Sequence, residues 1–286
     1  MILHFLGCDT AELSQSWQID RLRVLAVATE PAEPRPGELV TFSALIVSPV
    51  HPLAGSAWFV CDGGASDDFG CSADPALFEG GSLEEADPED LAAAGFIGFL
   101  PALPPAWLVP TDYLDSLEES ARLEGSFAMT YLAAIPEVPE GQTVDEDEVE
   151  LAYKRVPVSL AATPNHNPVV LTWRVDGFAI DPGAEVLLDP GQAYDLRAEL
   201  TPESFESYTF VTSLGVAEVR SEQPYLSWYL KDGSFSQSNS IFPLDSTVYF
   251  SPDDPADETA SLWVVVRDRR GGMGWSELRV RFIAPD

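Results

Sequence analysis

The chain has 286 residues, of which 47 are acidic and 15 are basic, so its formal net charge is −32. This excess of negative charge repels phosphate backbones and makes nucleic acid a poor partner. Hydrophobic residues make up 45% of the chain, enough to fill the cores of about two domains. The three cysteines are too few for a small disulfide scaffold.

The N-terminal region carries the tripeptide Leu6-Gly7-Cys8, which ends an apolar run and is followed by a polar stretch. It resembles the bacterial lipobox, in which the cysteine is lipidated and becomes the first residue of the mature protein. The resemblance implies that residues 1–19 are a signal-peptide remnant, lipobox and tether, and that Cys8 anchors the protein to a membrane of the cell envelope. Because seven residues precede Cys8, we expect the true reading frame to begin upstream of Met1. The alternative is a cytosolic protein with a chance Leu-Gly-Cys.

Residues 20–161 are predicted to form a first immunoglobulin-like β-sandwich. A Pro-Gly turn lies within Arg35–Ala44, and apolar residues alternate with others along the strand that follows it. Its predicted inward face consists of Val40, Phe42, Ala44 and Ile46. The other predicted strands are Leu22–Ala28, the tryptophan-bearing Ala57–Cys61, Gly125–Ile135 and Glu148–Leu160.

Cys61 and Cys71 are separated by nine residues rich in turn formers. In an oxidising compartment this pair predicts a disulfide. Closing so short a loop would stabilise the fold by about 2–3 kcal/mol. Two cysteines without a neighbouring histidine are too few ligands for zinc.

An insertion at about residues 72–124 is predicted to interrupt the first sandwich with helices. Asp74-Pro75 and Asp87-Pro88 each place an N-cap before a proline at the first helical position. Thr111 is expected to cap a longer helix, Asp112–Leu123, which Gly125 ends.

The segment Phe96–Val109 within this insertion is apolar but broken by prolines, and it is too short to span a membrane. We interpret it as a packed loop that covers the first sandwich, since monomers seldom expose large apolar patches. The alternative is a docking surface for a partner, with Trp107 and Phe99 as anchors.

Residues 162–286 are predicted to form a second sandwich that repeats the pattern of the first. A second Pro-Gly turn lies within Asp189–Ala198, and Trp228 is expected to be buried, as the core tryptophan of immunoglobulin-like sandwiches is. The inward face after the turn consists of Tyr194, Leu196, Ala198 and Leu200. The other predicted strands are Val169–Ile180, Tyr225–Leu230, Ser261–Arg267 and Trp275–Ile283, the last with Leu278, Val280 and Phe282 inward. Between the sandwiches, Ala161–Pro168 is interpreted as a plain linker in which Asn167 caps and His166 is exposed.

The whole pattern resembles a group of uncharacterised bacterial lipoproteins. The resemblance rests on Leu-Gly-Cys, a strand like Trp17–Val27, the Pro-Gly turn, a tryptophan strand ending in cysteine, and a segment like Leu262–Trp275. It covers most of the chain and implies tandem immunoglobulin-like domains. Its motifs mark strands and turns and imply no activity.

Catalytic motifs are scarce. The chain has no Gly-x-Ser-x-Gly, phosphate-loop or dinucleotide fingerprint, and the histidines outside the signal remnant are His51 and His166, both in loops with prolines. We therefore assign no catalytic residue and expect a protein that is not an enzyme. Glycoside hydrolysis stays open as an alternative, because it needs only a pair of carboxylates.

Two sets of residues are weak candidates for binding. Asp253, Asp254 and Asp257 could hold calcium, although we favour a solvated loop because they lack the spacing of an EF-hand. Trp263 and Trp275 could form an exposed pair that stacks on a sugar or a partner. The alternative for the tryptophans is contact with the other domain.

The leading hypothesis from the sequence is a non-enzymatic binding or structural module of the cell envelope. Its partners would be the membrane, through the lipid anchor, and an envelope protein or a glycan. The alternatives are a carbohydrate-active or carbohydrate-binding surface protein, or a calcium-stabilised adhesin. No cofactor other than calcium is expected.

Overall fold

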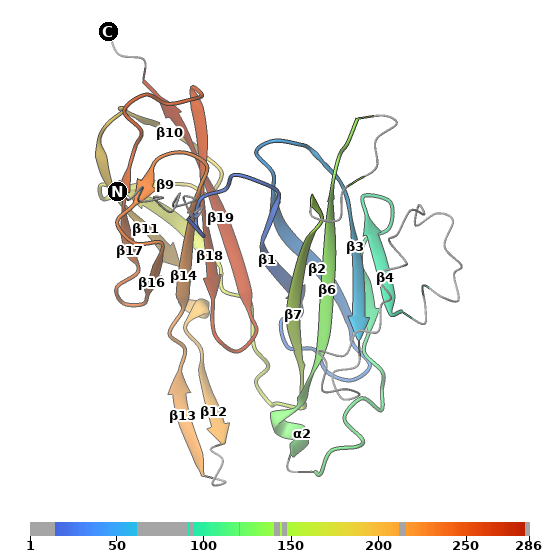
Figure 1. Ribbon diagram of the computed structural model, residues 1–286. Coiled ribbons are helices and arrows are strands. Elements are labelled where there is room, and N and C mark those ends of the chain that lie inside the picture. Colours follow the sequence, from blue (N-terminus) through green and yellow to red (C-terminus); the bar gives the residue numbers. More distant parts are fainter. Residues whose placement is uncertain are drawn as a thin grey trace, which may run out of the picture.

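Figure 1 shows the computed structural model, which describes residues 15–61, 91, 94–119, 121–139, 144, 148–211 and 216–283. These residues are mainly β-strand, with the short helices α2 (Ala121–Glu124) and η3 (Pro202–Ser204). The strands form sheets that pack in pairs around two separate hydrophobic cores.

The N-terminal sandwich contains a sheet of three strands and a sheet of four. The first has the order β1-β2-β5 and the second β4-β3-β6-β7. Their bounds are β1 (Arg23–Glu30), β2 (Leu39–Val47), β3 (Leu53–Cys61), β4 (Phe96–Leu100), β5 (Ala106–Leu108), β6 (Ser126–Pro136) and β7 (Glu150–Val158). Trp58 is fully buried between the sheets and packs on Phe42, while its indole N–H donates to Ser56 Oγ at 2.9 Å. The predicted inward face of β2 is confirmed, since its side chains belong to this core.

The Pro-rich segment extends both sheets of this sandwich. β4 pairs with β3 in one sheet, and β5, six residues further on, pairs with β2 in the other. A side chain at Gly98 would lie 2.5 Å from Pro105 Cα, so glycine permits this tight crossing. The interpretation as a covering loop is therefore wrong: the segment is part of the sandwich itself, and β4 and β5 are the edge strands of its two sheets.

The predicted helix Asp112–Leu123 is limited to α2. Residues 111–116 form turns, with i→i+3 hydrogen bonds such as Asp115 N to Asp112 O at 2.9 Å. Asp115, Glu118 and Glu119 would repel one another at i+3 and i+4 on a helix. The turns instead let Leu114 enter the core, where it is 2% exposed. Gly125 does end α2, as expected, with φ +79°. The helices expected after Asp74 and Asp87 lie outside the described residues.

The C-terminal sandwich has two five-stranded sheets, in the orders β10-β19-β18-β14-β16 and β15-β17-β11-β8-β9. Trp173 and Trp228 meet edge to face in its core with ring centroids 5.7 Å apart. Each indole N–H donates to a serine, Ser276 and Ser240 respectively. The strands are β8 (Val170–Val175), β9 (Phe178–Ile180), β10 (Glu185–Leu188), β11 (Ala193–Leu200), β14 (Tyr225–Leu230), β15 (Ser234–Phe235), β16 (Asn239–Ile241), β17 (Ser246–Phe250), β18 (Thr259–Arg267) and β19 (Met273–Phe282).

Most strand predictions for this sandwich are confirmed. β14 has the predicted bounds, and the inward residues of β11 and β19 belong to the core. The predicted strand Val169–Ile180 is instead a hairpin, because Asp176 and Gly177 adopt φ of +49° and +84°, as an Asp-Gly hairpin turn requires. The Pro-Gly turns are confirmed in both sandwiches, with Gly37 at φ +84° and Gly191 at φ +68°. A separate ribbon, β12 (Ser207–Val211) and β13 (Ala217–Ser221), extends away from the sheets (Figure 1).

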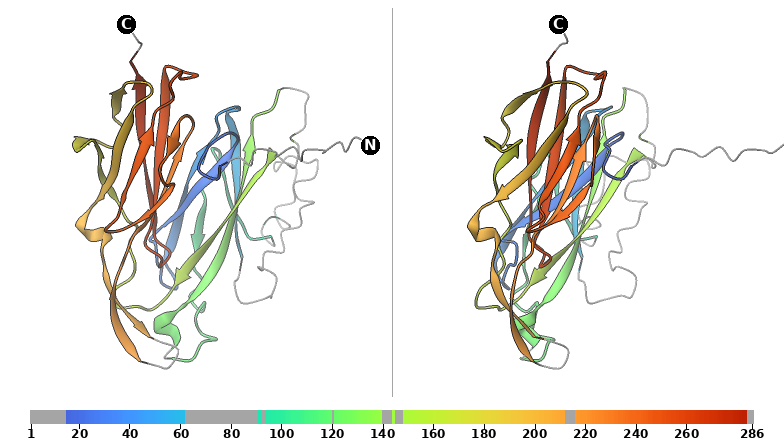
Figure 2. Two further views of the ribbon diagram at one scale, coloured as in Figure 1. Left: turned by 60° about the vertical axis from the view of Figure 1, so that its left-hand side comes forward. Right: turned by 90° about the vertical axis from the view of Figure 1, so that its left-hand side faces the viewer.

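The two sandwiches lie side by side, as the views of Figures 1 and 2 show. β1 of the N-terminal sandwich contacts β19 of the C-terminal sandwich. Between them, Ile19, Leu25 and Ala26 form a small buried cluster with Trp263 and Val265. Together with the linker Ala161–Pro168 and the β18–β19 turn, this cluster makes up the joint.

Candidate functional site

The apolar part of the joint contains both tryptophans of the predicted exposed pair. Trp263 is 8% exposed, and Trp275 is partly buried against the same cluster. The alternation in sequence predicted that these tryptophans face away from the C-terminal core, and β1 of the other sandwich covers that face. The prediction of an exposed pair is therefore corrected to its alternative, contact between the two halves of the chain.

Arg270, in the β18–β19 turn, is the centre of the polar part of the joint. Its guanidinium lies 3.0 Å from Glu206 Oε2, 3.0 Å from Glu222 Oε1 and 3.2 Å from Glu33 Oε2. It also stacks over the Tyr208 ring at 4.5 Å. One cation thus holds three carboxylates from three separate parts of the chain, and burial raises the pKa of Glu222 despite its bond to Arg270.

The linker belongs to the same network and is not a plain spacer. Asn165 is buried; its backbone N–H donates to Glu33 Oε2 at 2.7 Å and its side chain to Asp268 Oδ2 at 2.6 Å. Asn167 donates to Thr29 O and accepts from Met273 N, so it bridges both sandwiches. The predicted exposure of His166 is confirmed at 67% of its side chain, and the ring contacts Glu206. Among the described hydrogen bonds, none joins the ring of His51 or His166 to a hydroxyl or thiol; Ser48 Oγ accepts the backbone N–H of His51 at 3.3 Å.

Asp268 shapes the turn that presents Arg270. Its Oδ1 accepts the backbone N–H groups of Arg270, Gly271 and Gly272 at 2.7–3.0 Å. A Cβ at Gly272 would lie 1.9 Å from Asp268 Oδ2 and 2.8 Å from the backbone oxygen of His166, so this position favours glycine. Burial raises the pKa of Asp268, while the bonds it accepts oppose that shift.

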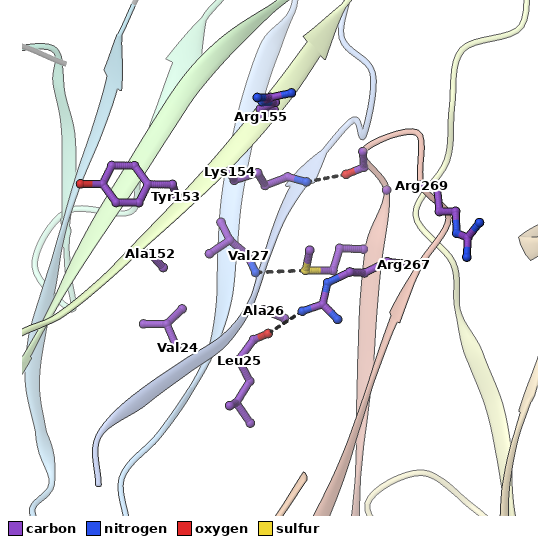
Figure 3. Close-up of a pocket in the computed structure, with 13 residues that line it drawn as sticks. Val24, Leu25, Ala26, Val27, Ala152, Tyr153, Lys154, Arg155, Arg267 and Arg269 are labelled. Carbon is purple, nitrogen blue, oxygen red and sulfur yellow. Dashed lines mark hydrogen bonds between the residues drawn. The ribbon is translucent and has the colours of Figure 1, made fainter. Parts of the chain in front are cut away.

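A groove of about 410 Å³ opens at the joint between β1, β7 and the β18–β19 turn (Figure 3). Lys154 reaches into it from β7 and donates to Gly271 O. Arg267 reaches in from β18 and donates to Leu25 O at 3.2 Å and Ser227 Oγ at 3.0 Å. Burial lowers the pKa of Lys154 to about 8; Asp268 opposes this and the charge of Arg267 adds to it.

A second cleft, of about 480 Å³, borders Trp263 on the other side of the joint. Lys231 and Asp257 form an ion pair of 2.7 Å at this cleft, and Glu185 pairs with Arg281 at 2.8 Å. The lining includes Ser48, Glu185, Lys231, Asp257, Thr259, Ser261, Trp263 and Arg279. The cleft therefore combines an aromatic edge with hydrogen-bond donors and acceptors, a composition that suits a polar ligand.

The calcium candidates do not form a ligand set. Asp253, Asp254 and Asp257 are exposed, and Asp257 is engaged with Lys231. Across the described part of the chain, no group of three or more acidic, histidine or cysteine side chains is arranged to hold a metal ion. Their arrangement fits the solvated loop that we favoured.

The remaining candidates are placed as follows. Trp107 is partly buried in the N-terminal core and packs edge to face on Tyr113, at 5.8 Å between ring centroids. Cys61 ends β3, whereas Cys8 and Cys71 lie outside the described residues, so lipidation and the Cys61–Cys71 disulfide stay predictions. None of the described helices has the length and apolar character needed to cross a bilayer.

The sequence analysis missed the residues of the joint. Lys154 could have been found, because it stands between Ala152 and Val156 on the inward face of β7, where a lysine has no place in an ordinary core. Arg270 gave no such signal. Its partners lie 48 to 237 residues away, and no local pattern links them.

No protein-family model matches the chain, and no curated protein matches it. Fifty-nine chains of solved structures do. They include a nucleoside hydrolase-related hypothetical protein from Saccharophagus degradans that is associated with carbohydrate metabolism (TM-score 0.31, 11% identity, 68% of this chain and 51% of that one). They also include the N-terminal Ig1-2 module of the Drosophila receptor protein tyrosine phosphatase DLAR (TM-score 0.28, 9% identity, 92% and 100%). The D0-D1 domain of intimin matches as well (TM-score 0.23, 11% identity, 91% and 99%).

The chain spans about half the length of the first of these proteins, with 51% of it covered. TM-scores this low carry no argument about function. The fold class rests instead on the paired sheets and the buried tryptophans described above.

Proposed function

We propose that the chain is a lipid-anchored protein of the cell envelope whose two tandem immunoglobulin-like domains act as a non-enzymatic binding or structural module. Residues 20–161 and 162–286 are the two domains, the first with the insertion at 72–124, and residues 1–19 carry the tether and Cys8. The Cys61–Cys71 disulfide belongs to the same proposal, because it requires an oxidising compartment.

The observation that supports this proposal best is the joint. Arg270, Asp268 and the linker asparagines make hydrogen bonds and ion pairs to both sandwiches, so they fix one sandwich against the other. A fixed angle between two domains preorganises any surface that they share and lowers the entropic cost of binding to it. In this proposal the role of these buried polar residues is structural: they hold the two domains together.

Anchoring is tested in the native bacterium with labelled palmitate. We expect the wild-type chain to incorporate the label and to fractionate with membranes, and the Cys8→Ser variant to do neither. A Cys61→Ser variant is the matched control, because it removes a cysteine and leaves the lipobox intact. Label that persists in Cys8→Ser, or wild-type protein found free in the cytosol with unpaired thiols, would refute the proposal.

Saccharide binding at the Trp263 cleft is a second candidate function, favoured by the polar groups around its aromatic edge. A glycan array and a hydrolase screen on the purified chain test it. The expected result is a specific glycan hit that Glu185→Gln and Asp257→Asn weaken and Glu218→Gln, on the β12–β13 ribbon, leaves unchanged. Turnover of a glycan would reverse the assignment as a non-enzyme.

A further inference from the structure

We infer that the groove between β1, β7 and the β18–β19 turn is a binding site for an anionic ligand, whose oxyanion group lies between Lys154 and Arg267. The inference gives the proposed binding module a ligand class and rests on that proposal for its biological meaning. It is carried by the distribution of charge, by the partners of Lys154 and by the walls of the groove.

The charge of the groove is opposite to that of the rest of the protein. Four of the 15 basic residues line it, and none of its described lining residues is acidic, although the chain has 47 acidic residues. The four are Lys154, Arg155, Arg267 and Arg269. In a chain with a threefold excess of acids, a groove whose described charged residues are all cations is not what a random distribution of charge produces.

Within the described part of the chain, these cations also have no counter-ion. Eight of the 15 basic residues form an ion pair with a described acidic residue, and the four of the groove are among the seven that do not. Arg155 stacks over the Phe127 ring at 4.8 Å, and Arg267 donates to neutral oxygens. The acids of this chain pair readily elsewhere, so the groove has been left open to an anion from outside.

Lys154 is the strongest indication of an anion site, because it is a buried cation that donates to a neutral acceptor. It is 6% exposed, and its hydrogen bond in the structure goes to Gly271 O, a neutral acceptor that uses one of the three ammonium protons. A buried ammonium without a counter-ion is costly, because its lost hydration is not replaced. An oxyanion in the groove would supply the missing charge and accept the remaining protons.

Asp268 is not that counter-ion. It acts on Lys154 from beyond ion-pair distance, and its oxygens already accept from three backbone N–H groups and from Asn165. Arg267 adds a like charge, which raises the energy of the charged lysine but acts on it less strongly than Asp268 does. Figure 3 shows both side chains reaching into the same space, while Arg155 and Arg269 lie at its margins and Tyr153 turns away.

The dimensions and walls of the groove define the ligand further. About 410 Å³ is within the range of pockets for small organic molecules. Val24, Ala26, Ala152 and Met273 give it apolar walls beside the cations. An arginine fork accommodates a carboxylate or sulfate through two hydrogen bonds. The ligand class is therefore a small organic oxyanion, either a free acid or the acidic unit of a saccharide.

The test is calorimetric titration of the full chain with glucuronate, with acetate and with glucose, the neutral counterpart of glucuronate, at constant ionic strength. We expect glucuronate to bind and glucose not to bind. If acetate binds as tightly as glucuronate, the groove is a site for any small acid. If acetate binds more weakly than glucuronate, the groove is a site for an acidic saccharide. Equal binding of glucuronate and glucose, or no binding of either acid, overturns the inference.

Variants locate the site. Lys154→Met is expected to weaken glucuronate binding about tenfold or more, the loss of one charge-assisted contact. Arg279→Gln is the matched control: Arg279 has no ion pair with a described residue either, donates to Gly183 O and lines the Trp263 cleft. Binding lost in Arg279→Gln and kept in Lys154→Met would move the site to that cleft and overturn the inference.

One readout needs no variant, in case Lys154→Met does not fold. The amide resonances of Ala26, Val27 and Gly271 in the wild-type chain are expected to shift with glucuronate and to stay fixed with glucose. Shifts confined to other residues contradict the site. Failure here leaves palmitate labelling of Cys8 untouched, so the inference and the proposed function fail separately.

Discussion

The cores of the two sandwiches and the joint between them are held by different forces. Trp58 is at the centre of the first core, and Trp173 and Trp228 are at the centre of the second. The indole N–H of each donates to a serine hydroxyl. The joint is held by Arg270, three glutamates and a buried aspartate as much as by apolar contact. Apolar burial thus fixes the fold of each half, whereas apolar contact and charge together fix how the halves are oriented. Changes of pH or salt should therefore act on the orientation more than on the two folds.

Truncating a core tryptophan should have the largest effect. Trp228→Ala removes a side chain that is fully buried against Trp173 and leaves Ser240 Oγ without its donor. We expect a loss of about 3–5 kcal/mol in the free energy of unfolding, measured by urea denaturation. The loss should be the same at low and high salt. A salt-dependent loss would mean that the core is not the apolar region that it is in this structure.

Removing the central cation of the joint should have the next largest effect. Arg270→Met leaves Glu33, Glu206 and Glu222 without their shared partner, and breaking a buried ion pair in this way costs about 3 kcal/mol. We expect the cost to shrink at acidic pH, because burial raises the pKa of Glu222 and this carboxylate is protonated there. The matched control is Arg220→Met, which breaks the exposed pair with Glu218 and should leave the melting temperature unchanged.

Lys154 should give a pH dependence of smaller size. Its pKa in the folded chain is about 8, below the ordinary 10.5, so between these values the unfolded chain binds a proton that the folded chain does not. Stability from this residue therefore rises with pH across that window, by no more than about 3 kcal/mol. Lys154→Met should remove the rise. Unfolding curves of both proteins at pH 8 and pH 10 check it, and parallel pH profiles would contradict the burial of this ammonium.

The smallest effect is expected for the calcium candidates. Asp253→Asn and Asp254→Asn remove exposed charges from a chain that is strongly acidic, so we expect little change in melting temperature with or without calcium. Differential scanning calorimetry with calcium and with magnesium is the measurement. A large rise that is specific to calcium and lost in either variant would restore the calcium-stabilised adhesin.

Much of each sandwich could be predicted from sequence because strand faces are local. Alternation located β14 to the residue and placed the inward side chains of β2, β11 and β19 correctly. It failed for β4 and β5, where prolines concealed two short edge strands, and for the helix at Asp112, where packing of Leu114 prevailed over the capping pattern.

The candidate sites could not be predicted in the same way. The groove depends on β1, β7 and the β18–β19 turn, which are brought together only when the sandwiches pack side by side. For Trp263 and Trp275 the alternation correctly predicted the outward face of the sheet, but not that this face is buried. The sequence pattern of an outward face is the same whether water or another sheet covers it. Among the residues of the groove, Lys154 could have been singled out from sequence, because a lysine stands between Ala152 and Val156 on the inward face of β7.

The position of Arg270 near the C-terminal end of the chain has a consequence for biogenesis. Because a polypeptide is synthesised from its N-terminus, the N-terminal sandwich can form before β18, the turn and β19 have been made. The orientation of the two halves is then fixed only when the last hairpin has formed and Arg270 can pair with Glu33, Glu206 and Glu222. Until that hairpin is in place, one sheet of the C-terminal sandwich lacks two of its strands and the halves have no fixed orientation. A premature stop before β19 would therefore leave both the C-terminal core and the joint incomplete.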